Sequence, residues 1–134
     1  GVFDLFHIGH LNMFKRAKEQ CRYLIVGVVS DEGVRLNKQA EPFVPFDERI
    51  EMVRSCKYVD EAIKLPLDFC GTRDMFKIYH FDVQFSGSDY EHDPAWLAEK
   101  EFLEKNGSTM VFFPYTQSTS STKLKRAIEN RINN

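Results

Sequence analysis

The stretch YLIVGVVS, from Tyr23 to Ser30, is a near-continuous apolar run. Apolar residues at successive positions, rather than at alternate ones, are typical of a strand buried on both faces of a parallel sheet. Val2 and Phe3 are expected to end a first strand. Three more short strands are expected at 59–65, 82–87 and 109–114. The sequence therefore predicts a parallel sheet of five strands.

Segments with apolar residues at helical spacing lie between these strands. They cover 10–20, 47–56, 73–79, 94–105 and a last segment from about Ser121. Asp93 before Pro94 is a favoured helix start, and Asn106-Gly107 is a favoured helix end. The alternation predicts a doubly wound, Rossmann-like α/β fold with helices on both faces of the sheet. Such folds bind ligands in a cleft outside the carboxyl ends of the strands.

The 134 residues, 43% of them hydrophobic, are expected to form one domain over 1–134. Gly1 stands within the expected end of a strand, so we expect the first strand to be truncated there. A net charge of −2 does not favour the broad basic surface of a nucleic-acid-binding protein. The expected partner is therefore a small molecule and not a nucleic acid.

Three cysteines, Cys21, Cys56 and Cys70, lack CxxC spacing, which indicates reduced thiols and a cytoplasmic protein. No apolar run approaches the roughly 20 residues of a membrane span, so no membrane association is expected. One longer loop, LNKQAEPFVP over 36–45, is interpreted as a lid over the cleft.

Within the opening stretch GVFDLFHIGH, the segment FDLFHIGH (3–10) is expected to be the turn from the first strand into the first helix. A helix start offers unpaired N–H groups and the positive end of a dipole, which suit phosphate oxygens. Gly9 allows close approach of a phosphate, and His7 and His10 can donate hydrogen bonds to charge that develops on phosphorus. The alternative is that one histidine caps the helix and the other packs in the core.

In four ordered blocks the chain resembles the cytidylyltransferase-like nucleotidyltransferases, which include glycerol-3-phosphate and ethanolamine-phosphate cytidylyltransferases. GVFDLFHIGH resembles the family signature G-x-F-D-x-x-H-x-G-H, of the HIGH type. Residues 16–32 and 48–63 are similar to two helix–strand blocks, and SGSDY (86–90) to the G-x-D-W turn. YTQSTSSTKLK (115–125) stands where the family has R-T-[EQ]-G-[IV]-S-T-T.

The resemblance implies transfer of a nucleotidyl group from a nucleoside triphosphate to a phosphorylated alcohol, by direct in-line attack and with release of pyrophosphate. CTP is the favoured donor and glycerol phosphate the favoured acceptor, followed by ethanolamine phosphate and choline phosphate. Mg²⁺ is implied on the phosphates, with no metal ligand from the protein. A homodimer is also implied. Such transfer requires positioning and charge neutralisation rather than a protein nucleophile.

The resemblance implies catalytic roles for His7, His10 and Lys38, with His10 the first candidate for stabilising the transition state. The implied nucleotide-binding residues are Val2, Phe3, Asp4, Gly9, Arg49, Lys57, Gly87, Asp89, Tyr115, Thr116, Gln117, Thr119, Ser120, Ser121 and Thr122. The alternative for the basic residues is a solvated charge, and for Asp89 and the hydroxyl cluster it is helix capping.

Three positions depart from the family pattern: Tyr115 stands at the signature arginine, Ser118 at the glycine and Tyr90 at the tryptophan. A phenol cannot replace the bidentate donors of a guanidinium. Phosphate charge would then be neutralised by Lys123 or Arg126 in the following helix. Alternatively, the tyrosine stacks on the base or the alcohol.

Three other functions remain open. The first is an adenylyltransferase that uses ATP and a sugar phosphate. The second is a nucleotide-binding module without turnover, which the changes at Tyr115 and Ser118 would explain. The third is a fragment of a class I aminoacyl-tRNA synthetase, which also uses H-I-G-H. Chain length, acidity and the lack of a K-M-S-K-S string count against this third function.

Overall fold

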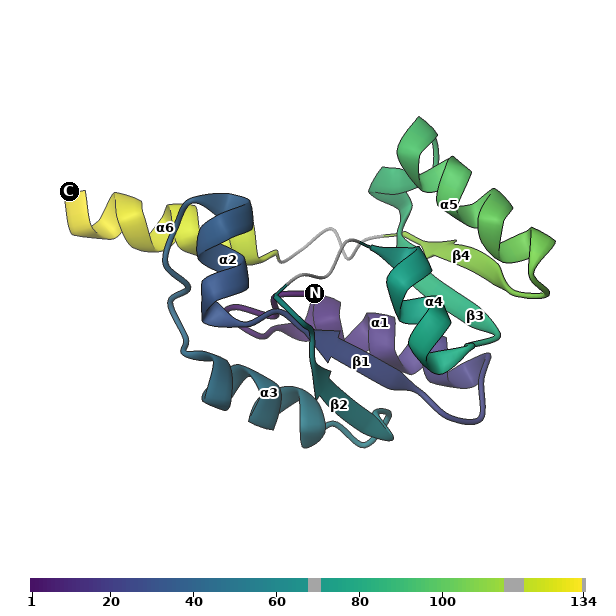
Figure 1. Cartoon of the computed structure of the whole chain (residues 1–134). Helices are drawn as coiled ribbons and strands as arrows, with labels where there is room; N and C mark the ends of the chain where they lie inside the picture. Colours follow the sequence, from purple (N-terminus) through teal and green to yellow (C-terminus); the bar gives the residue numbers. More distant parts are fainter. Residues whose placement is uncertain (68–70, 115–119, 134) are drawn as a thin grey trace. The chain divides into compact units, whose positions relative to one another are not determined.

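The computed structural model describes residues 1–67, 71–114 and 120–133, apart from the side chain of Lys38. The chain divides into two compact units (Figure 1). Unit 1 comprises residues 1–67 and 116–134, and unit 2 comprises residues 68–115. Each unit contains parallel strands joined through helices, which is the α/β pattern expected from the sequence.

Unit 1 is built on a parallel pair of strands, β1 (Ile25–Val28) and β2 (Glu61–Lys64), with Ile25 opposite Glu61. Its helices are α1 (Ile8–Glu19), α2 (Asp31–Lys38), α3 (Phe46–Arg54) and α6 (Ser121–Asn133). Helix α3 packs on both strands. Val26, Val28, Ile50 and Val53 are buried between them, as the apolar run 23–30 and the helical spacing of α3 predict.

The amino-terminal residue Gly1 forms two backbone hydrogen bonds with β1 and the residue after it. The amino group of Gly1 donates to the carbonyl of Gly27 at 2.8 Å, and the N–H of Val29 donates to the carbonyl of Gly1 at 3.0 Å. These two bonds follow the pattern of a parallel pairing, although residues 1–3 are not assigned to a strand. Residues 1–2 therefore lie where the sequence places the end of a first strand.

Unit 2 contains a second parallel pair, β3 (Val83–Gly87) and β4 (Thr109–Phe113). Its helical elements are α4 (Thr72–Tyr79), η1 (Ser88–Tyr90) and α5 (Pro94–Lys105). Helix α5 packs on β4, and Leu103 of the helix and Met110 of the strand are both buried. The predicted cap is confirmed, because the carboxylate of Asp93 accepts from the N–H of Ala95 at 2.8 Å.

Two expectations differ from the described structure. Residues 31–38 form helix α2, so the loop predicted at 36–45 begins only after Lys38. The helix was missed because it is short and contains Gly33 and Asn37, which have low helix propensity; its start is fixed by Ser30, whose hydroxyl accepts from the N–H of Gly33. The described residues also contain four strands, which form two separate pairs. A single five-stranded sheet is therefore not confirmed.

Arg49 of α3 is the largest polar side chain in the interior, with 1% of its surface exposed. Its Nε donates to the carbonyl of Val44 at 2.8 Å, and its Nη1 donates to the carbonyls of Val2 at 2.7 Å and Val29 at 2.8 Å. Its Nη2 forms an ion pair with Asp31 at 2.7 Å. One guanidinium thus joins the amino-terminal segment, the end of β1, the start of α2 and the loop before α3.

Replacing Arg49 by Met should lower the free energy of unfolding by about 3–5 kcal/mol, because Asp31 and three carbonyls would lose a buried charged partner. Arg54→Met is the matched control on the same helix, since Arg54 is exposed and pairs with exposed Glu51. The control should cost less than about 1 kcal/mol. Urea unfolding of both variants measures the difference, and an Arg49→Met cost equal to that of the control would contradict this structural role.

Candidate active site

Two histidines cap the start of α1. The Nδ1 of His7 accepts from the N–H of Gly9 at 3.0 Å, and the Nδ1 of His10 accepts from the N–H of His7 at 3.2 Å. These bonds satisfy backbone donors that a helix start leaves unpaired. Because each Nδ1 is an acceptor, the proton of each neutral ring lies on Nε2. The cap therefore fixes two imidazoles as Nε2–H donors.

Both rings are neutral at pH 7. Burial, with smaller electrostatic contributions from His7 and the amino terminus, lowers the pKa of His10 to about 4. Burial also lowers the pKa of His7. The His10 ring contacts the rings of Phe3 and Phe6, each with centroids 5.3 Å away, and that of His7 at 4.0 Å. Phe3 and Phe6 shield the His10 ring from water, and the lowered pKa values make both histidines hydrogen-bond donors rather than cations at pH 7.

Asp4 is buried beside this helix start and joins three segments of unit 1. Its carboxylate accepts from the N–H groups of Phe43 and Val44, each at 2.9 Å, and forms an ion pair with Lys125 of α6 at 2.9 Å. Its backbone carbonyl accepts from the hydroxyl of Ser121 at 2.6 Å. Burial raises the pKa of Asp4, but the hydrogen bonds from Lys125, Phe43 and Val44 outweigh it and hold the pKa below its usual range.

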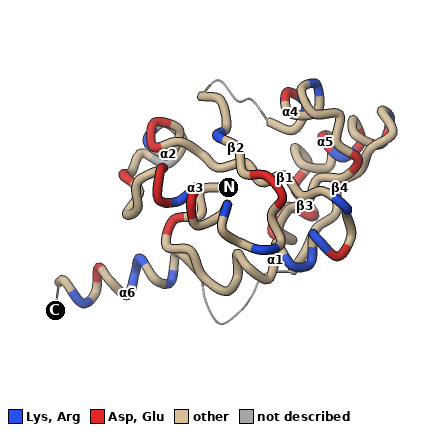
Figure 2. The backbone as a smooth tube through the Cα atoms, turned by 90° about the horizontal axis from the view of Figure 1, so that it is seen from below, with Lys and Arg blue, Asp and Glu red and all other residues tan. Residues whose placement is uncertain are grey.

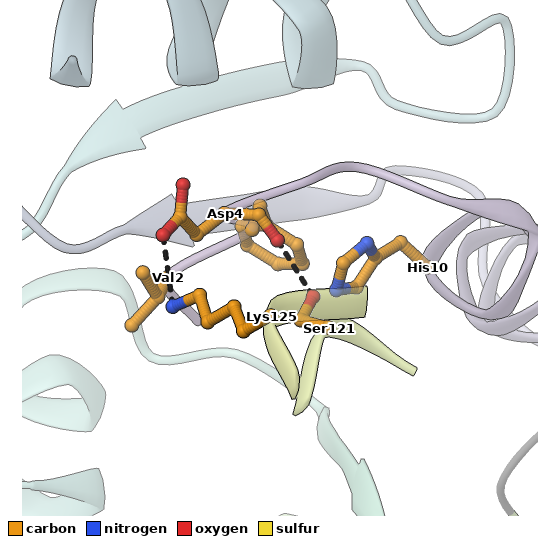
Figure 3. A pocket seen from close by; sticks show the side chains of 6 residues that line it. Val2, Asp4, His10, Ser121 and Lys125 are labelled. Atoms are coloured by element: carbon orange, nitrogen blue, oxygen red, sulfur yellow. Dashed lines mark hydrogen bonds and ion pairs between the residues drawn. The ribbon is translucent and has the colours of Figure 1, made fainter. Parts of the chain in front are cut away.

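Asp4, His10, Ser121 and Lys125 also line a cavity of about 180 Å³. Its walls are Val2, Phe3, Asp4, His10, Ser121 and Lys125. In Figure 3 the His10 ring extends from α1 toward Ser121, while Lys125 reaches the carboxylate of Asp4. The cavity therefore combines a helix start, a neutral imidazole donor and an ammonium, which are groups that bind phosphate oxygens.

Comparison with known proteins matches residues 1–127 to the model of the cytidylyltransferase-like family. The chain is 37% identical to an FAD synthase of Thermococcus kodakarensis over 98% of its own length and 88% of that protein. It is 32% identical to the glycerol-3-phosphate cytidylyltransferase of Bacillus subtilis, with 96% of this chain and 92% of that protein covered. The chain belongs to the cytidylyltransferase-like family. It is therefore a nucleotidyltransferase.

Two further matches agree with this family. An ethanolamine-phosphate cytidylyltransferase of Dictyostelium discoideum is 34% identical over 98% of this chain but only 37% of its own length. Among solved structures, a lipopolysaccharide core biosynthesis protein of Thermoplasma volcanium GSS1 aligns with a TM-score of 0.69 and 26% identity, over 89% of this chain and 93% of that one. The family and this neighbour support a Rossmann-like α/β fold.

The structure brings part of the predicted site together in unit 1. His10, Asp4, Val2, Phe3 and Ser121 line one cavity. His7 adjoins it through its ring contact with His10, and Gly9 is bound by His7. The hydroxyl of Ser120 accepts from the N–H of Lys123, which is the helix-capping alternative for this cluster, whereas Thr122 is exposed.

The three basic residues predicted for the site, Arg49, Lys57 and Lys38, are not among the described residues that line this cavity. Arg49 is neither a solvated charge nor directed at the cavity, because its N–H groups bind carbonyls and Asp31 inside unit 1. Lys57 is exposed over the ring of Tyr58, before the amino end of β2. His7 and His10 follow residues 1–2, which pair beside the carboxyl end of β1, whereas Lys57 precedes the amino end of β2. The structure therefore does not bring Lys57 to the two histidines. Lys38 ends α2, and its side chain lies outside the described structure.

The predicted residues of unit 2 lie at the carboxyl end of β3. Gly87 is buried at the end of the strand, and Asp89 is exposed in η1 without a capping bond to that helix. Tyr90 stacks on Trp96 of α5, with ring centroids 4.2 Å apart. Tyr115, Thr116, Gln117, Ser118 and Thr119 lie outside the described residues.

Sequence reasoning missed Lys125 as a site residue, although it closed the quoted block 115–125. The signal was available in the spacing, because residues four apart share one face of a helix. Ser121 and Lys125 lie one turn apart on α6, and both line the same cavity. Among the described residues no group of three or more His, Cys, Asp or Glu side chains could hold a metal ion. No helix in the described part of the chain has the length and apolar character needed to cross a membrane.

The neutral state of His10 predicts how stability depends on pH. Folded His10 has a pKa of about 4, against 6.5 for an ordinary histidine, so between these values the unfolded chain binds the additional proton. Stability should therefore fall as the pH falls from about 6.5 toward 4. The loss of Tm between pH 7 and pH 4.5 should be smaller in His10→Asn, which keeps an acceptor at the cap, than in the wild-type protein.

His80→Asn is the control for this measurement. His80 is exposed and ends α4 with a φ of 48°, a conformation that asparagine tolerates, so this variant should keep the wild-type pH dependence. An NMR titration in which the His10 ring gains its proton near pH 6.5 would contradict the neutral, half-buried imidazole.

Proposed function

We propose that the protein transfers CMP from CTP to the phosphate of a phosphorylated alcohol, with glycerol phosphate as the first candidate acceptor and ethanolamine phosphate or choline phosphate next. The observation that carries this proposal is the cavity at the start of α1, where His10, Ser121 and Lys125 surround a space lined by polar groups. The similarity to glycerol-3-phosphate cytidylyltransferases, which extends over 92% of the Bacillus subtilis protein, supports the choice of donor and acceptor.

In the proposed reaction, an oxygen of the acceptor phosphate forms a bond to the α-phosphorus of CTP. The bond from that phosphorus to the bridging oxygen breaks, and its electron pair leaves with pyrophosphate. Negative charge grows on the bridging and non-bridging oxygens during this exchange. The Nε2–H groups of His7 and His10 and the positive end of α1 are suited to stabilise that charge by hydrogen bonds, without a protein nucleophile.

Mg²⁺ belongs to this proposal as the ion that neutralises charge on the triphosphate. Magnesium is usually bound through substrate phosphates and one or two carboxylates. The one carboxylate that lines the cavity, Asp4, already accepts bonds from Phe43, Val44 and Lys125. We therefore assign the ion to the triphosphate oxygens rather than to Asp4.

A second candidate reaction is adenylyl transfer from ATP to FMN. The observation that favours it is the 37% identity to an FAD synthase over 88% of that protein's length. The bond chemistry is the same, because FMN is itself a phosphorylated alcohol and FAD formation joins its phosphate to AMP. The two candidate reactions thus share the site in unit 1. They differ in the base of the donor nucleotide and in the alcohol that carries the acceptor phosphate.

A matrix of CTP and ATP against glycerol phosphate, ethanolamine phosphate, choline phosphate and FMN tests both candidates by pyrophosphate release in the presence of Mg²⁺. Release that is specific to CTP with glycerol phosphate is the expected result, whereas release with ATP and FMN would select the second candidate. Binding of a triphosphate without release for any pair would instead identify a nucleotide-binding module without turnover.

With the pair that the matrix selects, His10→Asn should lower kcat by about 10²–10⁴-fold, because an Nε2–H donor beside the developing charge is lost. The matched substitution His80→Asn lies on unit 2 and should leave kcat within about twofold. Steady-state kinetics at saturating substrate measure both values. A His10→Asn enzyme that keeps more than half of its kcat would refute the assigned role.

A further inference from the structure

Two phenylalanine rings contact the imidazole of His10, and one of them lies at a position that the family signature leaves open. The Phe6 ring stacks on the His10 ring, with 29° between the planes and 5.3 Å between the centroids. The Phe3 ring meets the same imidazole edge-on, at 74° and 5.3 Å. Phe3 is the F of the signature G-x-F-D-x-x-H-x-G-H, whereas Phe6 stands where the signature allows any residue. The stacked contact is therefore a feature of this chain rather than of the signature.

The ring of Phe6 is itself held by the interior of unit 1. It packs against the ring of Phe14, with centroids 6.0 Å apart, and Phe14 is only 4% exposed. Phe14 lies four residues after His10 on α1, so the two residues share one face of the helix. Phe6 thus contacts both of them and links a buried anchor to the histidine that lines the cavity.

The turn that carries Phe6 to this position is strained. Phe3 and Leu5 have φ angles of 58° and 52°, in the left-handed region that large apolar residues rarely adopt. Such conformations persist only where the surrounding structure imposes them. Asp4, which lies between these two residues, accepts bonds from two backbone N–H groups of the loop before α3. These bonds hold the backbone in the conformation from which both phenylalanine rings reach His10.

The stacked ring restricts how the imidazole of His10 can turn. Its Nδ1 accepts from the N–H of His7 at 3.2 Å, so Nε2 is the nitrogen left to meet a ligand in the cavity. A single hydrogen bond fixes one atom of a planar ring and still permits the ring to tilt about that atom. Contact between two aromatic faces opposes this tilt. Phe6 therefore supplies a second constraint on the direction of the Nε2–H donor.

The same contact helps to keep this donor neutral. A proton on Nδ1 would remove the acceptor for the N–H of His7 and open the cap of α1. Among the described residues, the titratable or charged groups around the ring and its cavity are those of Gly1, whose amino group is charged, His7, Asp4 and Lys125. The Lys and Arg positions of α1 begin at Lys15, more than one turn beyond His10 (Figure 2). Burial is the largest cause of the lowered pKa of His10, and Phe6 contributes to that burial.

We propose that Phe6 is a positioning residue for nucleotidyl transfer, whose ring holds the imidazole of His10 with its Nε2–H directed at the cavity. This inference rests on the proposed function, because it takes His10 as the donor to the charge that develops in the reaction. Phe6 is not among the described residues that line the cavity, so it acts through His10. An aliphatic side chain at this position would fill the space but would offer no flat face to the imidazole.

The test compares the wild type with Phe6→Leu, Phe6→Tyr and Phe76→Leu. Phe6→Leu keeps an apolar side chain but removes the ring, and Phe6→Tyr keeps the ring. Phe76→Leu is the matched control, because Phe76 is also half-buried and its ring contacts another histidine, His80, at 5.4 Å in unit 2. Thermal unfolding shows whether each variant keeps its fold. An NMR titration follows the His10 ring, and steady-state kinetics with the substrate pair that the matrix selects give kcat and KM.

Phe6→Leu should lower kcat at pH 7 by about 5- to 50-fold and leave KM for the triphosphate within about threefold, because the misdirected donor serves the transition state. The pKa of His10 should also rise from about 4 toward 6.5 as water reaches the uncovered ring. Phe6→Tyr should keep kcat within about twofold, and Phe76→Leu should match the wild type. A side chain that only fills space predicts a lower Tm for Phe6→Leu with kcat within about twofold. That result, or an equal loss of kcat in Phe6→Tyr, overturns the proposal.

The outcome is separable from that of the proposed function, because the titration requires no substrate. If the wild type releases no pyrophosphate with any pair, the proposed reaction fails and the titration decides the inference. A raised pKa of His10 in Phe6→Leu then supports control of this ring by Phe6, and an unchanged pKa refutes it. If the wild type is active and Phe6→Leu keeps its kcat, the reaction stands and the inference fails.

Discussion

The candidate site depends on the buried carboxylate of Asp4. A buried charge is tolerated only when hydrogen bonds and an opposite charge replace its hydration, and Asp4 obtains these from two segments far from it in sequence. Two N–H groups come from the loop before α3, and the ammonium of Lys125 comes from α6. The requirement to satisfy one carboxylate therefore draws the loop and the last helix of unit 1 to the start of α1.

A second buried charge, Arg49, organises the other side of the same loop. Its guanidinium binds the carbonyl of Val44, whose N–H is bound by Asp4, so one residue of the loop is held by both buried charges. Arg49 is thereby committed to the fold, and the two capping histidines are neutral because burial lowers their pKa values. Among the described residues that line the cavity, positive charge comes from Lys125, which is paired with Asp4, and from the start of α1.

Much of the fold was readable from local patterns. The apolar run 23–30 and the short runs after it predicted four strands that the structure contains, because strands buried in parallel sheets are apolar at successive positions. Helix α5 was predicted with its bounds, because Asp93 and Pro94 fix its start chemically. Helix α2 was missed, because its propensity is weak and its stability comes from a cap and from the ion pair of Asp31 with Arg49.

The sequence by itself determined the family, the helix start that carries His7 and His10, and the strand-and-helix alternation. These features are local, so residue type and spacing suffice to specify them. The tertiary structure alone decided the roles of the charged residues. Whether a lysine or arginine is a fold element, a solvated charge or a site residue depends on which distant acceptors surround it. Arg49 meets carbonyls from three segments and Lys125 meets Asp4 across more than a hundred residues, and no pattern within a helix encodes these partners.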